Sequence, residues 1–235
     1  MKKQFEVWKL IPFYLLILGG FVIGTAFGSR AVTVMAESTP KPDRHCIIVD
    51  AGHGGEDGGT TSCSGVLESQ INLEISLRLN DLLHLLGYDT VMIRTTDKSV
   101  YTNGETIAEK KVSDLKERVR IANATEKGIL ISFHQNHFTD SKYSGAQVFY
   151  NRNDTGQRLA EIMQTNLVQT VNRNSNRKSK KADGVYLMEH AQIPGVLVEC
   201  GFLSNTAEDV KLRTPEYQKK LCCVIGATLS QFLNS

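Results

Sequence analysis

Four ionisable residues occupy positions from which a catalytic site can be assembled. His53 and His134 each follow a short apolar run, Glu68 begins a long helical pattern, and Glu199 lies near the end of a further apolar run. Two histidines with one carboxylate are a ligand set for catalytic zinc, which keeps its fourth position for a water whose pKa falls to about 7. A second carboxylate can take a proton from that water and pass it to a leaving nitrogen. The inventory fits a zinc hydrolase, although the four residues are far apart in the sequence.

The glycine-rich stretch around His53, IIVDAGHGGEDGG at residues 47–59, is open to other interpretations. It is not a phosphate-binding P-loop, because no Lys-Ser/Thr pair follows the glycines. A dinucleotide fingerprint fails as well, since the sixth position counted from Gly52 is Asp57. A glycine turn that carries an exposed histidine stays open as the plain structural reading of this stretch.

Each of the other residues also has a plain structural reading. A carboxylate at the start of a helix, such as Glu68, is favoured by the helix dipole alone. A histidine after a strand, such as His134 or the nearby His137, is often a surface residue. Glu199 could be ion-paired near a turn, although a glutamate that ends an apolar strand is rarely buried without a partner. What favours function is that His53, His134 and Glu199 all lie at predicted strand ends, where α/β folds bind ligands.

The elements that must position these residues alternate between strands and helices. Apolar and β-branched runs predict strands over 46–50, 90–94, 129–133, 146–150, 184–187 and 195–200, and helical spacing predicts helices over 68–86, 114–127, 154–171 and 216–233. This alternation predicts one α/β domain with a mostly parallel sheet over residues 45–235. Two long polar connections remain, residues 95–113 and the basic segment 173–181.

Residues 1–36 resemble an export segment. Lysines precede an uncharged stretch of 18 residues, from Leu10 to Phe27, and Val34–Ala36 offers a cleavage site. The same stretch is long enough to remain as a membrane anchor, with the following residues outside the cell. Residues 37–44, with two prolines, form a linker. We therefore expect an exported, extracytoplasmic protein whose only membrane contact is this segment.

Charge and cysteine content exclude other classes. Residues 1–36 carry four basic residues and one acidic residue, which leaves about −1 of the total charge of +2 for the remaining chain. That charge is not typical of a nucleic-acid-binding protein. The five cysteines match neither a disulfide framework nor a paired zinc motif.

Four segments, in this order, resemble the zinc-dependent N-acetylmuramoyl-L-alanine amidases of the type-3 family. They are IIVDAGHGG, GVLESQINLEISLRL, ISFHQNH and PGVLVECGFLSN, and the similarity covers about residues 45–233. The resemblance implies a six-stranded α/β fold of phosphorylase/hydrolase type. It also implies hydrolysis of the amide between N-acetylmuramic acid and L-alanine in peptidoglycan, which releases stem peptides.

The resemblance assigns a role to each residue. His53, Glu68 and His134 would be ligands of Zn²⁺, and Glu199 would be the catalytic glutamate. Glycines around His53 would clear space for the metal, with Gly54 and Gly55 giving the substrate close access.

Within the family, the small size, the export segment and the lack of wall-binding repeats most resemble germination-specific amidases of the spore cortex. Those enzymes act with a deacetylase to form muramic-δ-lactam. A vegetative cell-wall autolysin is the alternative. If activity is controlled, we expect control by expression, by an activating or regulatory protein partner, or through metal loading.

Three departures from the family pattern concern His137, Glu189 and an inserted helix that some relatives carry after the second histidine. His137 and Glu189 stand where relatives often carry a small and a basic residue, and the basic segment 173–181 could contact stem-peptide carboxylates or an acidic partner. No inserted helix after His134 is expected to plug the site. Two other functions compete with the amidase: a zinc carboxypeptidase or deacetylase on the same scaffold, and a non-catalytic wall-binding domain.

Overall fold

A single α/β unit follows the N-terminal segment. The structure, a computed structural model, describes residues 45–173 and 175–235, so the predicted export segment and the whole predicted linker lie outside the described residues. Residues 44–235 form one compact unit, separate from the residues that precede them. In this part of the chain, no helix combines the length and the hydrophobicity needed to cross a bilayer.

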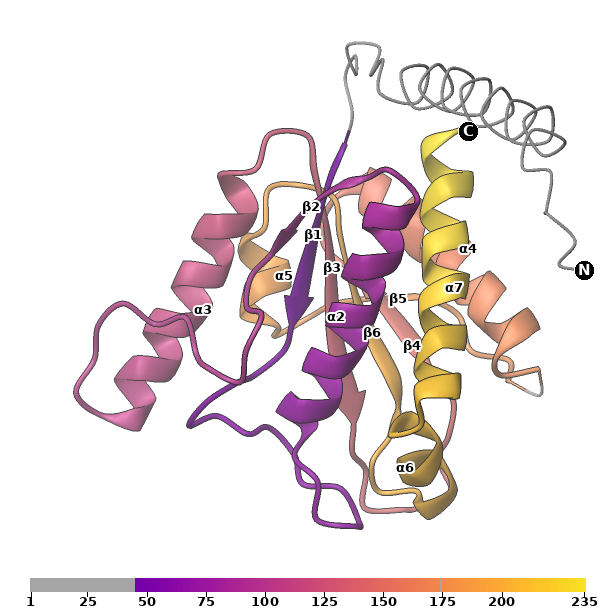
Figure 1. Cartoon of the computed structure of the whole chain (residues 1–235), viewed down its shortest axis with the longest axis horizontal. Coiled ribbons are helices and arrows are strands. Elements are labelled where there is room, and N and C mark those ends of the chain that lie inside the picture. The colour runs from indigo at the N-terminus through magenta and orange to yellow at the C-terminus, as the bar shows by residue number, and fades with distance from the viewer. Residues whose placement is uncertain (1–44, 174) are drawn as a thin grey trace, which may run out of the picture. The chain divides into compact units, whose positions relative to one another are not determined.

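Six strands form one sheet, as expected (Figure 1). Their order is β2-β1-β3-β6-β4-β5, and every neighbouring pair is parallel except β4 with β6. The strands are β1 (Cys46–Ala51), β2 (Asp89–Met92), β3 (Gly128–Asn136), β4 (Gln147–Tyr150), β5 (Lys180–Lys181) and β6 (Gly195–Phe202). The central strands β1, β3 and β6 are almost wholly buried, which is typical of a parallel sheet with helices on both faces.

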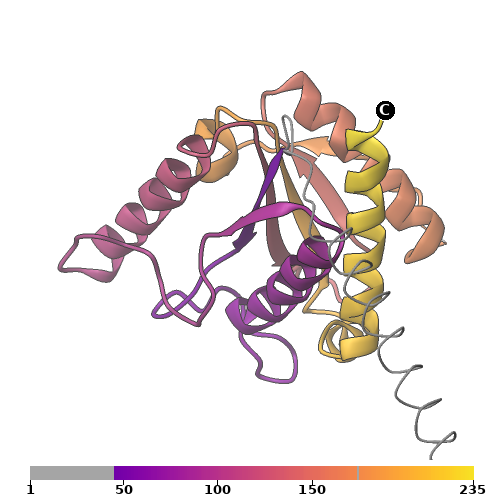
Figure 2. The ribbon, with the colours of Figure 1, turned by 45° about the horizontal axis from the view of Figure 1, so that its top comes forward.

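Helices cover the two faces unequally. The larger core joins one face to α2 (Glu68–Leu85), α4 (Asp154–Thr170) and α7 (Pro215–Leu233). The smaller core joins the other face to α3 (Ile107–Asn123) and α5 (Tyr186–His190). Figure 2 shows the sheet between α2 and α7 on one side and α3 and α5 on the other. The short α6 (Thr206–Leu212) follows β6 at the carboxyl edge of the sheet, at the lower edge of Figure 1.

Helix α3 begins earlier than its hydrophobic pattern predicted. We expected a helix over 114–127, but α3 runs over Ile107–Asn123 and takes up part of the predicted polar connection. The reason is a capping box: the Thr106 side chain accepts a hydrogen bond from the Glu109 backbone, and the Glu109 side chain accepts one from the Thr106 backbone. This exposed first turn carries no apolar stripe, so hydrophobic spacing alone does not reveal it.

The predicted strand over 184–187 was wrong. Residues Tyr186–His190 form the short helix α5, and the edge strand β5 lies earlier, at Lys180–Lys181. Leu187 and Met188 pack into the smaller core, so one helical turn buries them as well as a strand would.

Helix α6 was not expected. It begins at Asn205, whose side chain accepts hydrogen bonds from the backbone N–H groups of Ala207 and Glu208.

Candidate metal centre and catalytic carboxylate

Three side chains from separate elements meet at the carboxyl edge of the sheet. His53 lies in the loop after β1, Glu68 is the first residue of α2, and His134 lies within β3 rather than after it. His53 has a φ of 61°, which is unusual for a residue other than glycine. Such backbone strain persists only where surrounding contacts hold it, and it is common at functional sites.

The ligand atoms of His53, Glu68 and His134 all lie within 4.8 Å of one another. Glu68 Oε1 lies 3.3 Å from His53 Nε2 and 3.0 Å from His134 Nδ1. The two imidazole rings stand edge to face, with centroids 4.9 Å apart. The structure therefore brings together the three residues that the sequence analysis nominated, in an arrangement that could hold a metal ion.

Glu199 lies beside this cluster because of strand register. It is the register partner of His134 across β3 and β6, and parallel partners point to the same face of a sheet. Its Oε2 atom is buried and has no hydrogen-bond partner among the described residues. Burial raises the pKa of Glu199 to about 7, against the effect of His134 and His53, and Glu68 adds to the rise. A carboxyl with a pKa near 7 can both accept and donate a proton at neutral pH.

Glycines leave room for the imidazole rings, but not at the positions that we expected. A Cβ atom at Gly52 would collide with the His134 ring. One at Gly59 would lie 2.7 Å from both Glu68 Oε2 and His53 Cδ2. Gly54 and Gly55, which we expected to admit substrate, instead pack against the segment that contains Lys98 and Ser99. The glycine-rich stretch thus accommodates the ligand side chains themselves.

Hydrogen bonds from neighbouring residues orient the side chains of His53 and Glu68. Asp57 Oδ2 lies 3.0 Å from His53 Nδ1, so His53 Nε2 faces Glu68. A carboxylate behind a histidine is the usual arrangement at metal sites, where it sets the ring orientation and raises ligand basicity. Glu68 Oε1 accepts hydrogen bonds from the Gln135 backbone and the Asn72 side chain, and its Oε2 accepts one from the Thr60 backbone.

Two buried arginines clamp the backbone that carries His53. Arg94 donates hydrogen bonds to the Ala51 and Gly52 carbonyl oxygens, at 2.8 and 3.0 Å. Arg118 donates to the Ala51 and His53 carbonyl oxygens, at 2.9 and 2.7 Å. Both arginines are at most 4% exposed. Four charge-assisted hydrogen bonds across three residues explain how the strained conformation of His53 is held.

Arg118 also pairs with the buried Asp50, which in turn accepts a hydrogen bond from Ser132. Burial alone would raise the pKa of Asp50, but Arg118 and Ser132 outweigh it and lower that pKa. Sequence analysis did not single out Asp50, Asp57, Arg94 or Arg118. Two of them could have been found from the sequence. Asp50 is a charged residue in an otherwise apolar strand, and Asp57 is an acidic residue four positions after His53.

The electrostatics of the cluster favour a bound cation. Burial acts to lower the pKa of His53, but Asp57 and Glu68 outweigh it and raise that pKa to about 9. Burial likewise acts to raise the pKa of Glu68, yet the two histidines hold it well below its usual range. A site that stabilises positive charge on its own histidines offers the same negative potential to a metal ion.

The remaining nominated residues lie outside this cluster. His137 is exposed and is not one of the three clustered ligands. The exposed Glu189 accepts a hydrogen bond from the Gly184 backbone, at 2.8 Å, and so stabilises the turn before α5. Residues 137–146, which connect β3 to β4, contain no helix, in agreement with the expectation that nothing inserted there plugs the site.

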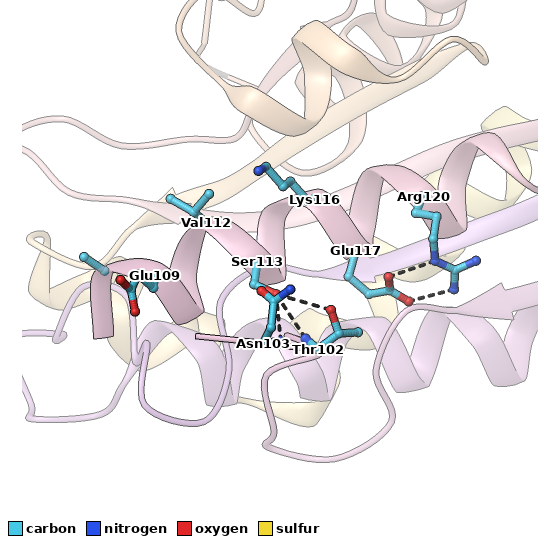
Figure 3. Close-up of a pocket in the computed structure, with 9 residues that line it drawn as sticks. Thr102, Asn103, Glu109, Val112, Ser113, Lys116, Glu117 and Arg120 are labelled. Carbon is cyan, nitrogen blue, oxygen red and sulfur yellow. Dashed lines mark hydrogen bonds and ion pairs between the residues drawn. The ribbon is translucent and has the colours of Figure 1, made fainter. Parts of the chain in front are cut away.

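A separate pocket of about 490 Å³ lies between α3 and the loop before it (Figure 3). The Ser113 hydroxyl accepts hydrogen bonds there from the backbone N–H groups of Thr102 and Asn103, while Glu117 pairs with Arg120 along the helix. None of the four nominated residues lines this pocket. It is therefore distinct from the candidate catalytic site.

Known proteins are similar to this chain over most of its length. A family model described as N-acetylmuramoyl-L-alanine amidase matches residues 47–230. The germination-specific N-acetylmuramoyl-L-alanine amidase of Bacillus subtilis is 36% identical over 181 residues, which are 76% of each chain. The amidase LytC of the same organism is 29% identical over 177 residues, which are 74% of this chain and 32% of LytC.

A solved structure is also similar. The CwlD amidase from Clostridioides difficile, determined in complex with the GerS lipoprotein, superposes with a TM-score of 0.78 at 35% identity. The match covers 81% of this chain and 99% of that one.

Proposed function

The chain belongs to the N-acetylmuramoyl-L-alanine amidase family, and we propose that it cleaves the amide between N-acetylmuramic acid and L-alanine in the peptidoglycan of the spore cortex. The observation that carries this proposal is the juxtaposition of three metal-type ligands with a buried carboxylate. Glu199 stands in register with His134 on the neighbouring strand, so a proton-transfer group lies next to the place for a Lewis acid.

We propose that His53, Glu68 and His134 hold Zn²⁺. The donors are two imidazole nitrogens and one carboxylate oxygen, a set that catalytic zinc sites use with one position left for water or substrate. The fit rests on the close approach of the three ligand atoms and on the negative potential around them. When bound, zinc supplies a Lewis acid that promotes attack of water on the amide carbonyl.

Glu199 supplies the proton transfers. Its pKa near 7 lets the carboxylate take a proton from the attacking water. The same carboxyl group then donates that proton to the nitrogen of L-alanine as the amide bond breaks. Because Oε2 has no hydrogen-bond partner among the described residues, it is available to face water and then the leaving nitrogen. Asp57, Arg94 and Arg118 hold the His53 side chain and backbone in place during these steps.

We further propose that the chain works outside the cytoplasm during spore formation, with a protein partner. This rests on the germination-specific relative and on the CwlD amidase, which was solved with the GerS lipoprotein. The proposed export segment, residues 1–36, would deliver the domain to the space where cortex is assembled. The similarity to LytC makes a vegetative wall function the second candidate.

A metal assay combined with product analysis tests the function. Purified protein should contain about one zinc per chain and should release stem peptides with free L-alanine amino termini from cortex peptidoglycan, as read by mass spectrometry. Release of D-alanine would instead indicate a carboxypeptidase, and release of acetate a deacetylase. Deleting the gene separates the two biological settings: loss of muramic-δ-lactam from spores supports the cortex role, and a defect confined to vegetative walls contradicts it.

A further inference from the structure

A basic groove lies beyond β4, between residues 142–145, the segment on either side of residue 174, and the start of α6. Its volume is about 750 Å³. Four basic side chains line it, and the only acidic one among its lining residues is Glu208; the basic ones are Lys142, Arg173, Arg177 and Lys211. Because the chain after residue 36 is close to neutral, this is a local concentration of positive charge rather than a general property of the surface.

The fold neutralises this charge only in part, since Lys142 pairs with Asp140 at 2.7 Å and Lys211 lies 3.9 Å from Glu208 Oε1. Glu208 is 4% exposed, and its Oε2 accepts hydrogen bonds from the Gly145 and Phe202 backbone N–H groups, so this carboxylate supports the groove floor. Among the described residues, Arg177 donates only to neutral oxygens: the Ser144 carbonyl at 3.2 Å and Gln147 Oε1 at 3.4 Å. These contacts leave a guanidinium charge available to a ligand.

Aromatic rings in and beside the groove orient that cation. The Arg177 guanidinium lies 5.0 Å from the centre of the Phe202 ring, and Tyr143 stacks on the same ring. Lys142 lies over Tyr143, and Lys211 lies over Tyr217. Cations held over aromatic faces lose less freedom when they bind an anion, since part of their motion is already restricted.

Strand pairing links the groove to the candidate catalytic site. Gln147, which Arg177 contacts, is the register partner of Glu199 across β4 and β6, and Glu199 is the partner of His134 across β6 and β3. Neighbouring strands are ~4.8 Å apart, so the backbones of Gln147 and His134 are about 10 Å apart. An extended peptide advances about 3.4 Å per residue, so three or four residues span the distance from the scissile amide to Arg177.

We propose that the basic groove binds the carboxylates of the stem peptide beyond the L-alanine whose amide is cleaved. This inference rests on the proposed function and adds which part of the substrate is recognised. The stem peptide carries carboxylates at residues past L-alanine, and arginine and lysine together suit such separated anions. The glycan, which is held on the other side of the scissile bond, offers no matching series of charges.

Charge reversal tests the groove without touching the catalytic residues. The variant Lys142→Glu/Lys211→Glu changes two exposed side chains, and Lys219→Glu, on the exposed face of α7, is the control for one such charge reversal outside the groove. Each protein is assayed with a soluble muropeptide bearing free stem carboxylates and with the same muropeptide after amidation of those carboxylates. Thermal unfolding confirms that the variants are folded.

We expect the double reversal to raise KM for the free-carboxylate substrate about tenfold, with kcat within about twofold. Amidation should raise the KM of the wild-type protein by a similar factor and should leave the KM of the double variant nearly unchanged. Lys219→Glu should behave as wild type. Isothermal titration with the free stem peptide should show the same loss of affinity in the double variant.

Two results would overturn the inference. One is an unchanged KM in the double variant. The other is an equal rise in KM for both substrates, which would mean that the groove acts on something other than the stem carboxylates, such as an acidic partner protein. Failure of the proposed function is a different result: the wild-type protein with bound zinc would then release no stem peptide from either muropeptide.

Discussion

The candidate metal site (His53, Glu68 and His134) and the basic groove lie along the same edge of the sheet but are built in opposite ways. In the cluster, Glu68 is 3% exposed and every nominated ligand is fixed by at least one buried partner. In the groove, Lys142 is 70% exposed and its ion pair is with Asp140, itself a surface residue. Proton transfer and metal ligation depend on atoms held in place, whereas recognition of a flexible peptide tolerates mobile side chains.

The largest expected effect separates chemistry from recognition. Glu199→Gln keeps the shape of the side chain but removes its ability to accept a proton, so kcat should fall by ~10²–10⁴ while zinc content stays at the wild-type level. The matched control is Glu189→Gln, the same change at an exposed carboxylate on α5. Turnover at the wild-type rate in Glu199→Gln would remove this residue from the mechanism.

A second test concerns stability. Arg118→Met removes one partner of a buried ion pair and leaves Asp50 without its counterion, which should lower the free energy of unfolding by about 3–5 kcal/mol. Lys142→Met in the groove should change it by less than about 0.5 kcal/mol. Urea denaturation of both variants measures the difference. Equal losses would show that the contrast between a rigid cluster and a mobile groove is mistaken.

Asp57→Asn should act on metal affinity with a smaller effect. The amide cannot supply the charge that supports His53 Nδ1, so zinc affinity should fall about 10–100-fold, as for other carboxylates behind metal-binding histidines. Competition with a zinc chelator gives the affinity directly, without an activity assay. A normal affinity would mean that Arg94 and Arg118 suffice to position His53.

Two glycine substitutions test whether the space around the ligands matters. Gly59 and Gly65 both have positive φ, at 68° and 86°, so alanine at either position costs roughly 1–2 kcal/mol of backbone strain. Only at Gly59 would the new Cβ lie against Glu68 and His53, since nothing lies within 4 Å of it at Gly65. Gly59→Ala should therefore lose zinc and Gly65→Ala should keep it. Equal zinc contents would contradict this role for Gly59.

The smallest effect is a dependence of stability on acid. Folding lowers the pKa of Asp50, so this group contributes stability that is complete above its unfolded pKa of about 3.9 and is lost as pH falls through the lower, folded value. The free energy of unfolding should therefore decline below about pH 4, and the decline should be shallower in Asp50→Asn. An identical acid profile in that variant would assign the effect to other carboxyls.

Much of the scaffold follows from local patterns. Apolar runs located β1, β4 and β6, and helical spacing located α2, α4 and α7, to within a residue or two, because these elements bury a continuous face. Strand β3 was also located, but it continues to Asn136, three residues beyond its apolar run. Prediction of secondary structure failed for elements that show no periodic pattern of buried apolar residues. The first turn of α3 depends on a capping box, α5 is too short to show a period, and α6 depends on the Asn205 cap.

By itself, the sequence determined the family and the α/β class, and it predicted four candidate site residues, His53, Glu68, His134 and Glu199. Residue types at strand ends and ordered motifs are local features, so they can be found without the tertiary structure. Tertiary structure alone decided the contacts between segments remote in sequence. It placed Arg94 and Arg118 under the loop that carries His53. It also brought Gly52 and Gly59 against the side chains of the candidate ligands, and it joined three separate segments into the basic groove. These contacts depend on how strands and helices pack against one another, and no periodicity along the chain encodes that packing.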